Sequence, residues 1–172
     1  MPGIRVLQTR SFARSFSDCL ARNPLKIQIV APFMDKPLAF PSVSSFSSFV
    51  LGRGVKYLEI TTIPPDSKGG SLRKDEADLL EKLGVALKIR TNPFLHSKIY
   101  YFEFDNPSFF AFIGSANFSL GGFSSNDETM VEITSTEDQV PVRKELERLT
   151  GLGALPYHAW KSNSKKGLIE NA

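Results

Sequence analysis

Hydrophobic residues in the first ninety positions follow two spacings, one typical of helices and one typical of buried strands. In three segments they recur every three or four residues, and a Pro or Gly after each segment favours the end of a helix. Three short, nearly continuous apolar runs alternate with these segments and are typical of strands covered on both faces. Such alternation predicts crossover connections and a sheet with helices packed on it. The expected helices span 11–22, 42–51 and 71–83, and the expected strands span 25–33, 55–62 and 85–90.

After residue 90 the pattern changes to aromatic-rich strands. Residues 97–104 and 109–114 alternate at strand period and are separated by a turn cluster at 105–108, which predicts an antiparallel hairpin. A further strand is expected at 127–134 and a last helix at 141–150. The expected fold class is therefore α/β, with a mixed β-sheet flanked by helices on both faces.

Length and composition fit one compact domain. The chain has 172 residues, of which 41% are hydrophobic and 23% charged. These values are ample for a buried core and exclude global disorder. We expect a single domain over residues 1–160 and a flexible basic tail over 161–172.

Charge and cysteine usage narrow the class of protein. The net charge is +3, and the first 60 residues hold eight Lys or Arg against three Asp or Glu, a modest indication of a polyanionic partner. One cysteine, Cys19, and two histidines exclude an intrachain disulfide and a four-ligand zinc site. Without a secretion signal or a membrane-length apolar run, we expect a cytoplasmic protein with no membrane partner. No Walker loop or dinucleotide fingerprint occurs, so no cofactor is expected.

The residues that suggest chemistry lie at one end of the expected hairpin. His96 and Lys98 are two positions apart at the start of a strand, so both side chains project from one face of the sheet. Ser115 and Asn117 repeat this spacing after Gly114, a residue that lets backbone approach closely. An imidazole, an ammonium, a hydroxyl and a carboxamide together suit a phosphoryl group, because they supply a nucleophile or proton carrier and donors for its oxygens.

A carboxylate completes this set. Glu128 opens the next expected strand, eleven residues after Asn117. A carboxylate at this place would hold His96 in one tautomer, as the third member of a catalytic triad does. The candidate catalytic residues are therefore His96, Lys98, Ser115, Asn117 and Glu128.

These spaced residues resemble the signature of the phospholipase D superfamily, H-x-K-x4-D followed by G-S/T-x-N. His96, Lys98 and Glu103 match the first half, with Glu in place of Asp, and residues 114–117 match the second. The sequence is most similar to the superfamily's small bacterial nucleases and metal-independent restriction endonucleases, in which N-x-E follows at a fixed distance, as residues 126–128 do here. The strand and helix alternation before the motifs fits the superfamily's α/β sandwich.

Two features depart from the signature. The segment between Glu103 and Gly114 is longer than usual, which a lengthened hairpin turn would absorb. Glu103 also lies at an odd separation from His96, so an unbulged strand would point it to the opposite face. We therefore interpret Glu103 as structural and Glu128 as the carboxylate partner of His96.

The resemblance implies a mechanism without a metal ion. One His96 would attack phosphorus to form a phosphohistidine, a second would protonate the leaving oxygen, and Lys98 and Asn117 would stabilise the charge on the phosphoryl oxygens. The superfamily builds one centre from two H-x-K motifs, and this chain has one. The resemblance therefore implies a homodimer with one shared site.

The expected function is that of a metal-independent phosphodiesterase, an endonuclease module of restriction type that acts on DNA. A chain of this length has room for the catalytic domain only, so sequence recognition would need a separate domain or subunit. One alternative is a phospholipase D-type lipid phosphodiesterase or transferase, which would need an exposed apolar rim or amphipathic anchor. Another is a catalytically silent module for nucleic-acid binding or dimerisation.

Several candidates also have a purely structural interpretation. Ser115 and Asn117 could cap a short helix over residues 118–122. Alternating aromatic residues of the hairpin are expected in the core rather than as platforms for bases; they are Tyr100, Phe102, Phe110 and Phe112. A basic group in the 62–74 loop either contacts phosphates or forms a solvated helix start; its members are Lys68, Arg73 and Lys74.

Overall fold

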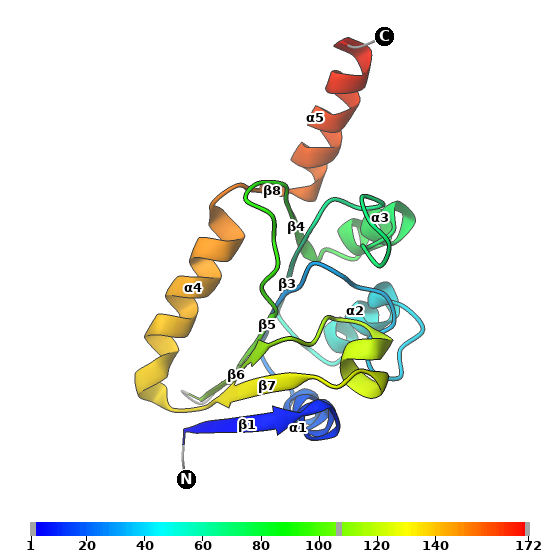
Figure 1. Ribbon diagram of the computed structural model, residues 1–172. Helices are drawn as coiled ribbons and strands as arrows, with labels where there is room; N and C mark the ends of the chain where they lie inside the picture. Colours follow the sequence, from blue (N-terminus) through cyan, green and yellow to red (C-terminus); the bar gives the residue numbers. More distant parts are fainter. Residues whose placement is uncertain (1–2, 106–107, 171–172) are drawn as a thin grey trace.

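The structure is a computed structural model that describes residues 3–105 and 108–170. Its centre is an eight-stranded sheet with the strand order β1-β7-β6-β5-β2-β3-β4-β8 (Figure 1). The strands are β1 (Ile4–Gln8), β2 (Lys26–Val30), β3 (Tyr57–Thr62), β4 (Ala86–Arg90), β5 (Ile99–Glu103), β6 (Phe109–Gly114), β7 (Thr129–Ile133) and β8 (Ala154–Pro156).

The sheet is mixed. Strands β2, β3 and β4 are parallel neighbours, whereas β5 runs antiparallel to β2 and to β6. The outer pairs, β6 with β7, β7 with β1 and β4 with β8, are also antiparallel. Val30 at the end of β2 pairs with Ile99 at the start of β5. The carboxyl ends of the parallel strands and the start of β5 therefore lie together at the edge of the sheet formed by the strand ends.

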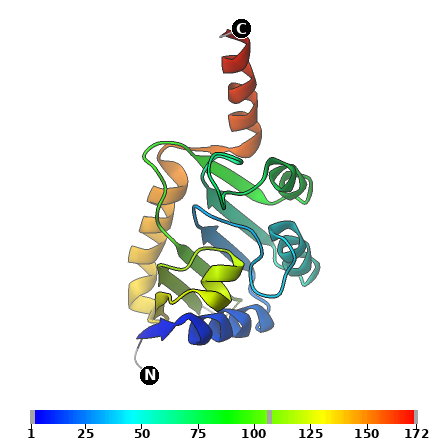
Figure 2. The same ribbon diagram turned by 45° about the vertical axis from the view of Figure 1, so that its right-hand side comes forward.

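Helices cover both faces of the sheet, as Figure 2 shows: α1, α2 and α3 lie on one face and α4 on the other. The last helix, α5, extends away from the body of the molecule (Figures 1 and 2). The helices are α1 (Thr9–Ala21), α2 (Val43–Gly52), α3 (Lys74–Lys82), α4 (Gln139–Gly151) and α5 (Tyr157–Glu170), with a π-helical turn at Gly121–Ser125 and a 3-10 turn at Thr136–Asp138.

Aromatic packing joins α1 to the sheet. Phe12 and Phe16 lie one helical turn apart on the buried face of α1 and are fully buried. The Phe12 ring stacks on Phe123 of the π-helical turn at a centroid distance of 4.9 Å, and Phe16 meets Phe102 of β5 edge to face at 5.0 Å. This cluster fixes the π-helical turn and the strands of the hairpin to one helix, so the loops that follow β6 have a rigid base.

The expected α/β class with a mixed sheet and helices on both faces is confirmed. The structure adds β1 and β8, which the sequence pattern did not reveal because both are short edge strands with exposed residues. Helix α5 extends through residues 161–170, where we expected a flexible tail. The expected turn at 105–108 includes residues 106 and 107, which lie outside the described residues.

Candidate active site

His96 and Lys98 lie side by side where the chain enters β5. His96 is exposed and Lys98 is buried, with 6% of its surface accessible. The Lys98 Nζ atom is 3.2 Å from His96 Nε2 and donates a hydrogen bond of 2.9 Å to the His96 carbonyl oxygen. Because an ammonium has no lone pair, a charged Lys98 can only donate in this contact, and the ring then accepts at Nε2. The structure thus presents a histidine at the surface, backed by a buried amine.

Two features of its environment act on the pKa of Lys98 in opposite directions. Burial lowers its pKa from the usual 10.5, because an ammonium loses hydration there. The negative charge of Glu128 acts in the opposite direction and raises this pKa. The pKa of Lys98 therefore depends both on its burial and on the charge of Glu128, which lies in the segment before β7.

Glu128 is buried just before β7 and holds three segments together. Its carboxylate accepts hydrogen bonds from the Ser115 hydroxyl and, at 3.1 Å, from the Asn126 side-chain amide. Its backbone N–H donates to the Thr9 hydroxyl oxygen at 2.9 Å, and that hydroxyl donates to the Asn126 carbonyl at 2.7 Å. The Thr129 N–H donates to the Ser115 hydroxyl oxygen at 3.1 Å. The start of α1, the end of β6 and the start of β7 are thus fixed around one carboxylate.

Asn117 lies in the turn after β6. Its side-chain Oδ1 is buried and has no hydrogen-bond partner among the described residues. Its backbone is held by Gly122, where an added Cβ would lie 2.1 Å from the Asn117 carbonyl oxygen. The next residue, Phe118, forms a bridge with Met34, which follows β2. These contacts place the Asn117 turn against the loop between β2 and α2.

One close approach of the backbone and one hydrogen bond constrain the sequence around this turn. A Cβ on Gly114 would lie 2.2 Å from the Thr129 carbonyl oxygen, so no larger residue fits between β6 and β7. The buried Tyr100 of β5 donates its hydroxyl hydrogen bond to the Ala116 carbonyl at 2.8 Å. Burial, and secondarily the charge of Glu128, raises the pKa of this Tyr100 hydroxyl, which therefore stays a donor.

The structure brings all five candidate residues to the same edge of the sheet, since the start of β5, the end of β6 and the start of β7 are neighbours there. One expected contact is not formed: in the described chain Glu128 bonds to Ser115 and Asn126 and makes no hydrogen bond to His96. The physical reason is the register, which sets Glu128 beside the end of β6 rather than beside the loop before β5.

Glu103 lies at the other end of β5. There it pairs with Lys26 in the strand register, and its carboxylate accepts a hydrogen bond of 3.0 Å from the Tyr101 hydroxyl. This position agrees with the interpretation of Glu103 as structural. Glu103, which matches the carboxylate of the H-x-K-x4-D spacing, is therefore separated from the His96 imidazole by the length of β5.

The structure bears differently on the purely structural interpretations of the capping residues, the hairpin aromatics and the basic group. The π-helical turn has Leu120 at its N-cap and no side-chain cap, so neither Ser115 nor Asn117 caps it. The hairpin aromatics Tyr100, Phe102 and Phe112 are fully buried, which confirms their expected place in the core, and Phe110 is half-buried. Of the basic group, Lys68 lies over the ring of Phe94, with its Nζ atom 4.2 Å from the ring centroid. Phe94 precedes His96 by two residues.

Sequence reasoning missed two residues of this network. Asn126 entered the sequence analysis only through the N-x-E spacing and not as a candidate residue, and Thr9 was not considered. The N-x-E spacing was the available signal for Asn126, because residues two apart can share a face. Nothing local pointed to Thr9, which is 119 positions from its partner Glu128.

The described residues contain neither a metal-binding cluster nor a membrane-spanning helix. Within 3–105 and 108–170, no group of three His, Cys, Asp or Glu side chains is placed to hold a metal ion. In the same part of the chain, no helix is long and apolar enough to span a membrane.

Comparison with known proteins gives one match to a family and several to solved structures. A family model described as "Cardiolipin synthase, PLD-like domain" matches residues 4–150. No curated protein sequence matches the chain. Nuc from Salmonella typhimurium, a phospholipase D family member, superposes with a TM-score of 0.64 at 16% identity, covering 91% of this chain and 99% of Nuc.

Two further structures share the fold. NucT from Helicobacter pylori superposes with a TM-score of 0.58 at 14% identity, covering 90% of this chain and 98% of NucT. Phosphatidylserine synthase from Haemophilus influenzae Rd KW20 gives 0.60 at 13% identity, covering 99% of this chain and 47% of the synthase. At these identities the likeness is one of fold.

Proposed function

The chain belongs to the phospholipase D-like family, and from this premise we propose that it is a metal-independent phosphodiesterase that cleaves DNA. The observation that carries the proposal is the contact between His96 and Lys98, because it places an imidazole at the surface beside an amine that can carry a positive charge. A neutral imidazole is a nucleophile, and a cation beside it can bind a non-bridging phosphoryl oxygen.

In the proposed reaction the lone pair of His96 Nε2 attacks phosphorus. The bond from phosphorus to the leaving oxygen breaks, and a second His96 gives that oxygen its proton. This second imidazole then takes a proton from water, whose oxygen displaces His96 from phosphorus. Lys98 exchanges its hydrogen bond with the imidazole for one with a phosphoryl oxygen, which frees Nε2 for attack.

Asn117 would bind the other side of the phosphoryl group, and Ser115, whose hydroxyl donates to Glu128, would hold the turn beside it. The buried Oδ1 of Asn117 leaves its amide nitrogen as the atom able to donate to a phosphoryl oxygen. Glu128 acts as a positioning residue, because it fixes the Ser115 hydroxyl and favours the charged form of Lys98. A free ammonium would otherwise lose its proton more easily in this buried place.

The second imidazole would come from another copy of the chain. Each chain has one H-x-K motif, and His96 is exposed. Two large apolar side chains near the site, Phe94 and Leu120, are each 49% exposed. A second copy that faces the first across a twofold axis would cover them and complete the site.

DNA is the proposed substrate because the N-terminal third of the chain is basic and the chain shares the fold of Nuc along nearly the full length of both proteins. Within this proposal the chain is an endonuclease module of restriction type, and recognition of a DNA sequence would belong to a separate domain or subunit. A lipid phosphodiester is the second candidate, favoured by the description of the matching family and by the fold shared with phosphatidylserine synthase.

The proposal is tested by incubating plasmid DNA with the protein in excess EDTA. We expect cleavage by the wild type and none by His96→Ala. His158→Ala is the matched control, since His158 is exposed on α5 and outside the five candidate residues. Cleavage that stops in EDTA and returns with Mg²⁺ would refute the metal-independent mechanism. Cleavage of phospholipid vesicles but not of plasmid would favour the second candidate.

A further inference from the structure

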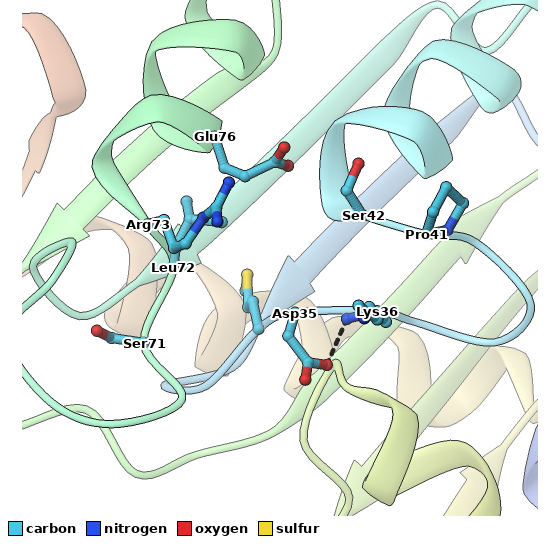
Figure 3. Close-up of a pocket in the computed structure, with 9 residues that line it drawn as sticks. Asp35, Lys36, Pro41, Ser42, Ser71, Leu72, Arg73 and Glu76 are labelled. Carbon is cyan, nitrogen blue, oxygen red and sulfur yellow. Dashed lines mark hydrogen bonds between the residues drawn. The ribbon is translucent and has the colours of Figure 1, made fainter.

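A cavity of about 210 Å³ lies beside the candidate active site, between the loops that follow β2 and β3. Figure 3 shows Arg73 and Glu76, from the start of α3, facing Pro41 and Ser42 at the start of α2, with Asp35 and Lys36 below them. We call it the side pocket. Ligands of open α/β sheets commonly bind outside the carboxyl ends of the strands, which is where this pocket lies.

The side pocket shares a wall with the Asn117 turn. The Asp35 N–H donates to the Phe118 carbonyl at 3.2 Å, and the Leu120 N–H donates to Asp35 Oδ1 at 3.1 Å. Met34, which lines the pocket, bridges to Phe118, the residue after Asn117. A substrate whose phosphodiester binds at Asn117 therefore has its next group within reach of the pocket.

The polar groups of the side pocket carry both signs of charge. Arg73 and Lys36 are cations with exposed side chains, whereas Glu76 and Asp35 are carboxylates. Glu76 is half-buried and held in place by the Ser44 N–H at 3.0 Å and the Ser44 hydroxyl at 3.1 Å. A phosphate offers only acceptors and would face two carboxylates here. A group with donors and acceptors on one edge fits both kinds of side chain.

The rest of the lining consists of two serines, Ser42 and Ser71, and of apolar side chains. Met34 and Leu72 are buried, with 2% and 1% of their surfaces exposed, and Pro41 completes the set. The volume is below the roughly 300–1,000 Å³ of pockets that enclose a drug-sized ligand, so the pocket admits a fragment rather than a whole nucleotide. Apolar lining suits the faces of a flat ring, and the charged groups suit its polar edge.

From this combination we infer that the side pocket binds a nucleobase of the strand being cleaved, next to the phosphodiester at Asn117. The inference rests on the proposed function and deepens it. A base inside a duplex is stacked and paired and cannot enter a pocket, so the substrate is single-stranded nucleic acid or a nucleotide extruded from a duplex. Arg73 and Glu76 are then specificity-determining residues for the base.

The test compares a short single-stranded oligonucleotide, its duplex, and the same strand with abasic sites throughout. We expect the wild type to cleave the single strand about tenfold faster than the duplex or the abasic strand, because the duplex must first extrude its base and the abasic strand has no base to bind. Arg73→Ala and Glu76→Gln should lower kcat/KM for the single strand about tenfold while the abasic strand loses much less. Lys82→Ala, at the exposed far end of α3, is the matched control.

Equal losses on the normal and abasic strands would overturn the inference, as would equal cleavage of single strand and duplex by the wild type. A chromogenic phosphodiester without a base separates this failure from failure of the proposed function: its hydrolysis by the wild type supports the chemistry whatever the side pocket binds. Competition by phosphatidylserine vesicles that is lost in Arg73→Ala would assign the pocket to a lipid headgroup and would also overturn the inference.

Discussion

At the scale of single residues, we expect different effects on kcat from neutralising Glu128 and Glu103, although each is a carboxylate at one end of a strand. Glu128→Gln should lower kcat, because it replaces the charged acceptor that holds Ser115 and Asn126. A hydrogen bond to a charged group contributes about 1.5–3 kcal/mol, which corresponds to a loss of roughly tenfold to hundredfold. Glu103→Gln should retain near wild-type kcat, because its contact is with Tyr101 at the far end of β5. Plasmid cleavage rates of both folded variants measure this difference, and equal losses would contradict it.

We expect the pKa of Lys98 to set the alkaline limb of the profile of activity against pH. Its ammonium must be charged to bind a phosphoryl oxygen, and burial lowers its pKa below the usual 10.5. Activity should therefore fall as the pH rises, starting below the pH at which an ordinary lysine titrates. Because the Glu128 charge raises the Lys98 pKa, Glu128→Gln should move this limb to still lower pH. A limb that moves to higher pH, or does not move, would show that Lys98 is not the titrating group.

Lys98 and Glu128 also show how much of the candidate site could be predicted from the sequence. The spacing of His96, Lys98, Ser115 and Asn117 was enough to select the four as candidates, although both pairs lie just outside the strands β5 and β6. It was not enough to identify what Glu128 contacts. That contact depends on which strand lies next to which, and the register of β6 with β7 places Glu128 beside Ser115.

At the scale of elements, the contact between β6 and β7 predicts the effect of a single methyl group. Gly114→Ala would put a Cβ 2.2 Å from the Thr129 carbonyl oxygen, so one of the two strands must shift. Overpacking of this kind costs about 1–3 kcal/mol, and the unfolding free energy should fall by that amount in urea denaturation. Gly52→Ala, at the end of α2, is the control, because its Cβ meets nothing within 4 Å. Equal stability of both variants would contradict the close approach of the two strands at Gly114.

Edge elements were the part of the fold that the sequence pattern did not reveal. In β1 only Leu7 is buried, so its apolar residues do not mark a covered strand, and its pairing with β7 joins Ile4 to Ile133. In β8 three residues, one of them Pro156, are too few for a period. The inner strands were predictable because both of their faces are covered, which makes them nearly continuous apolar runs.

At the scale of the whole molecule, the proposed dimer predicts how activity depends on mixing. If wild-type chains are mixed and refolded with His96→Ala chains, a heterodimer has one imidazole and lacks either the nucleophile or the proton donor. Loss of the donor alone costs roughly 10²–10⁴-fold, so only wild-type homodimers contribute. Activity should therefore follow the square of the wild-type fraction. A linear dependence, or a fully active monomer in light scattering, would mean that each chain has a complete site.

The Asn117 Oδ1 atom, which has no hydrogen-bond partner in the described part of the chain, has a consequence for heat resistance. A buried oxygen without a partner costs about 1–3 kcal/mol, so this turn holds the folded state below the stability that its packing would allow. Asn117→Leu should abolish cleavage and raise Tm by about 2–4 °C, as expected for 1 kcal/mol in a domain of this size. Circular dichroism melting measures the shift, and a lower Tm would show that the carboxamide stabilises the turn. On this view the protein gives up thermal stability at Asn117 to keep a donor ready for substrate, a trade-off between robustness and activity.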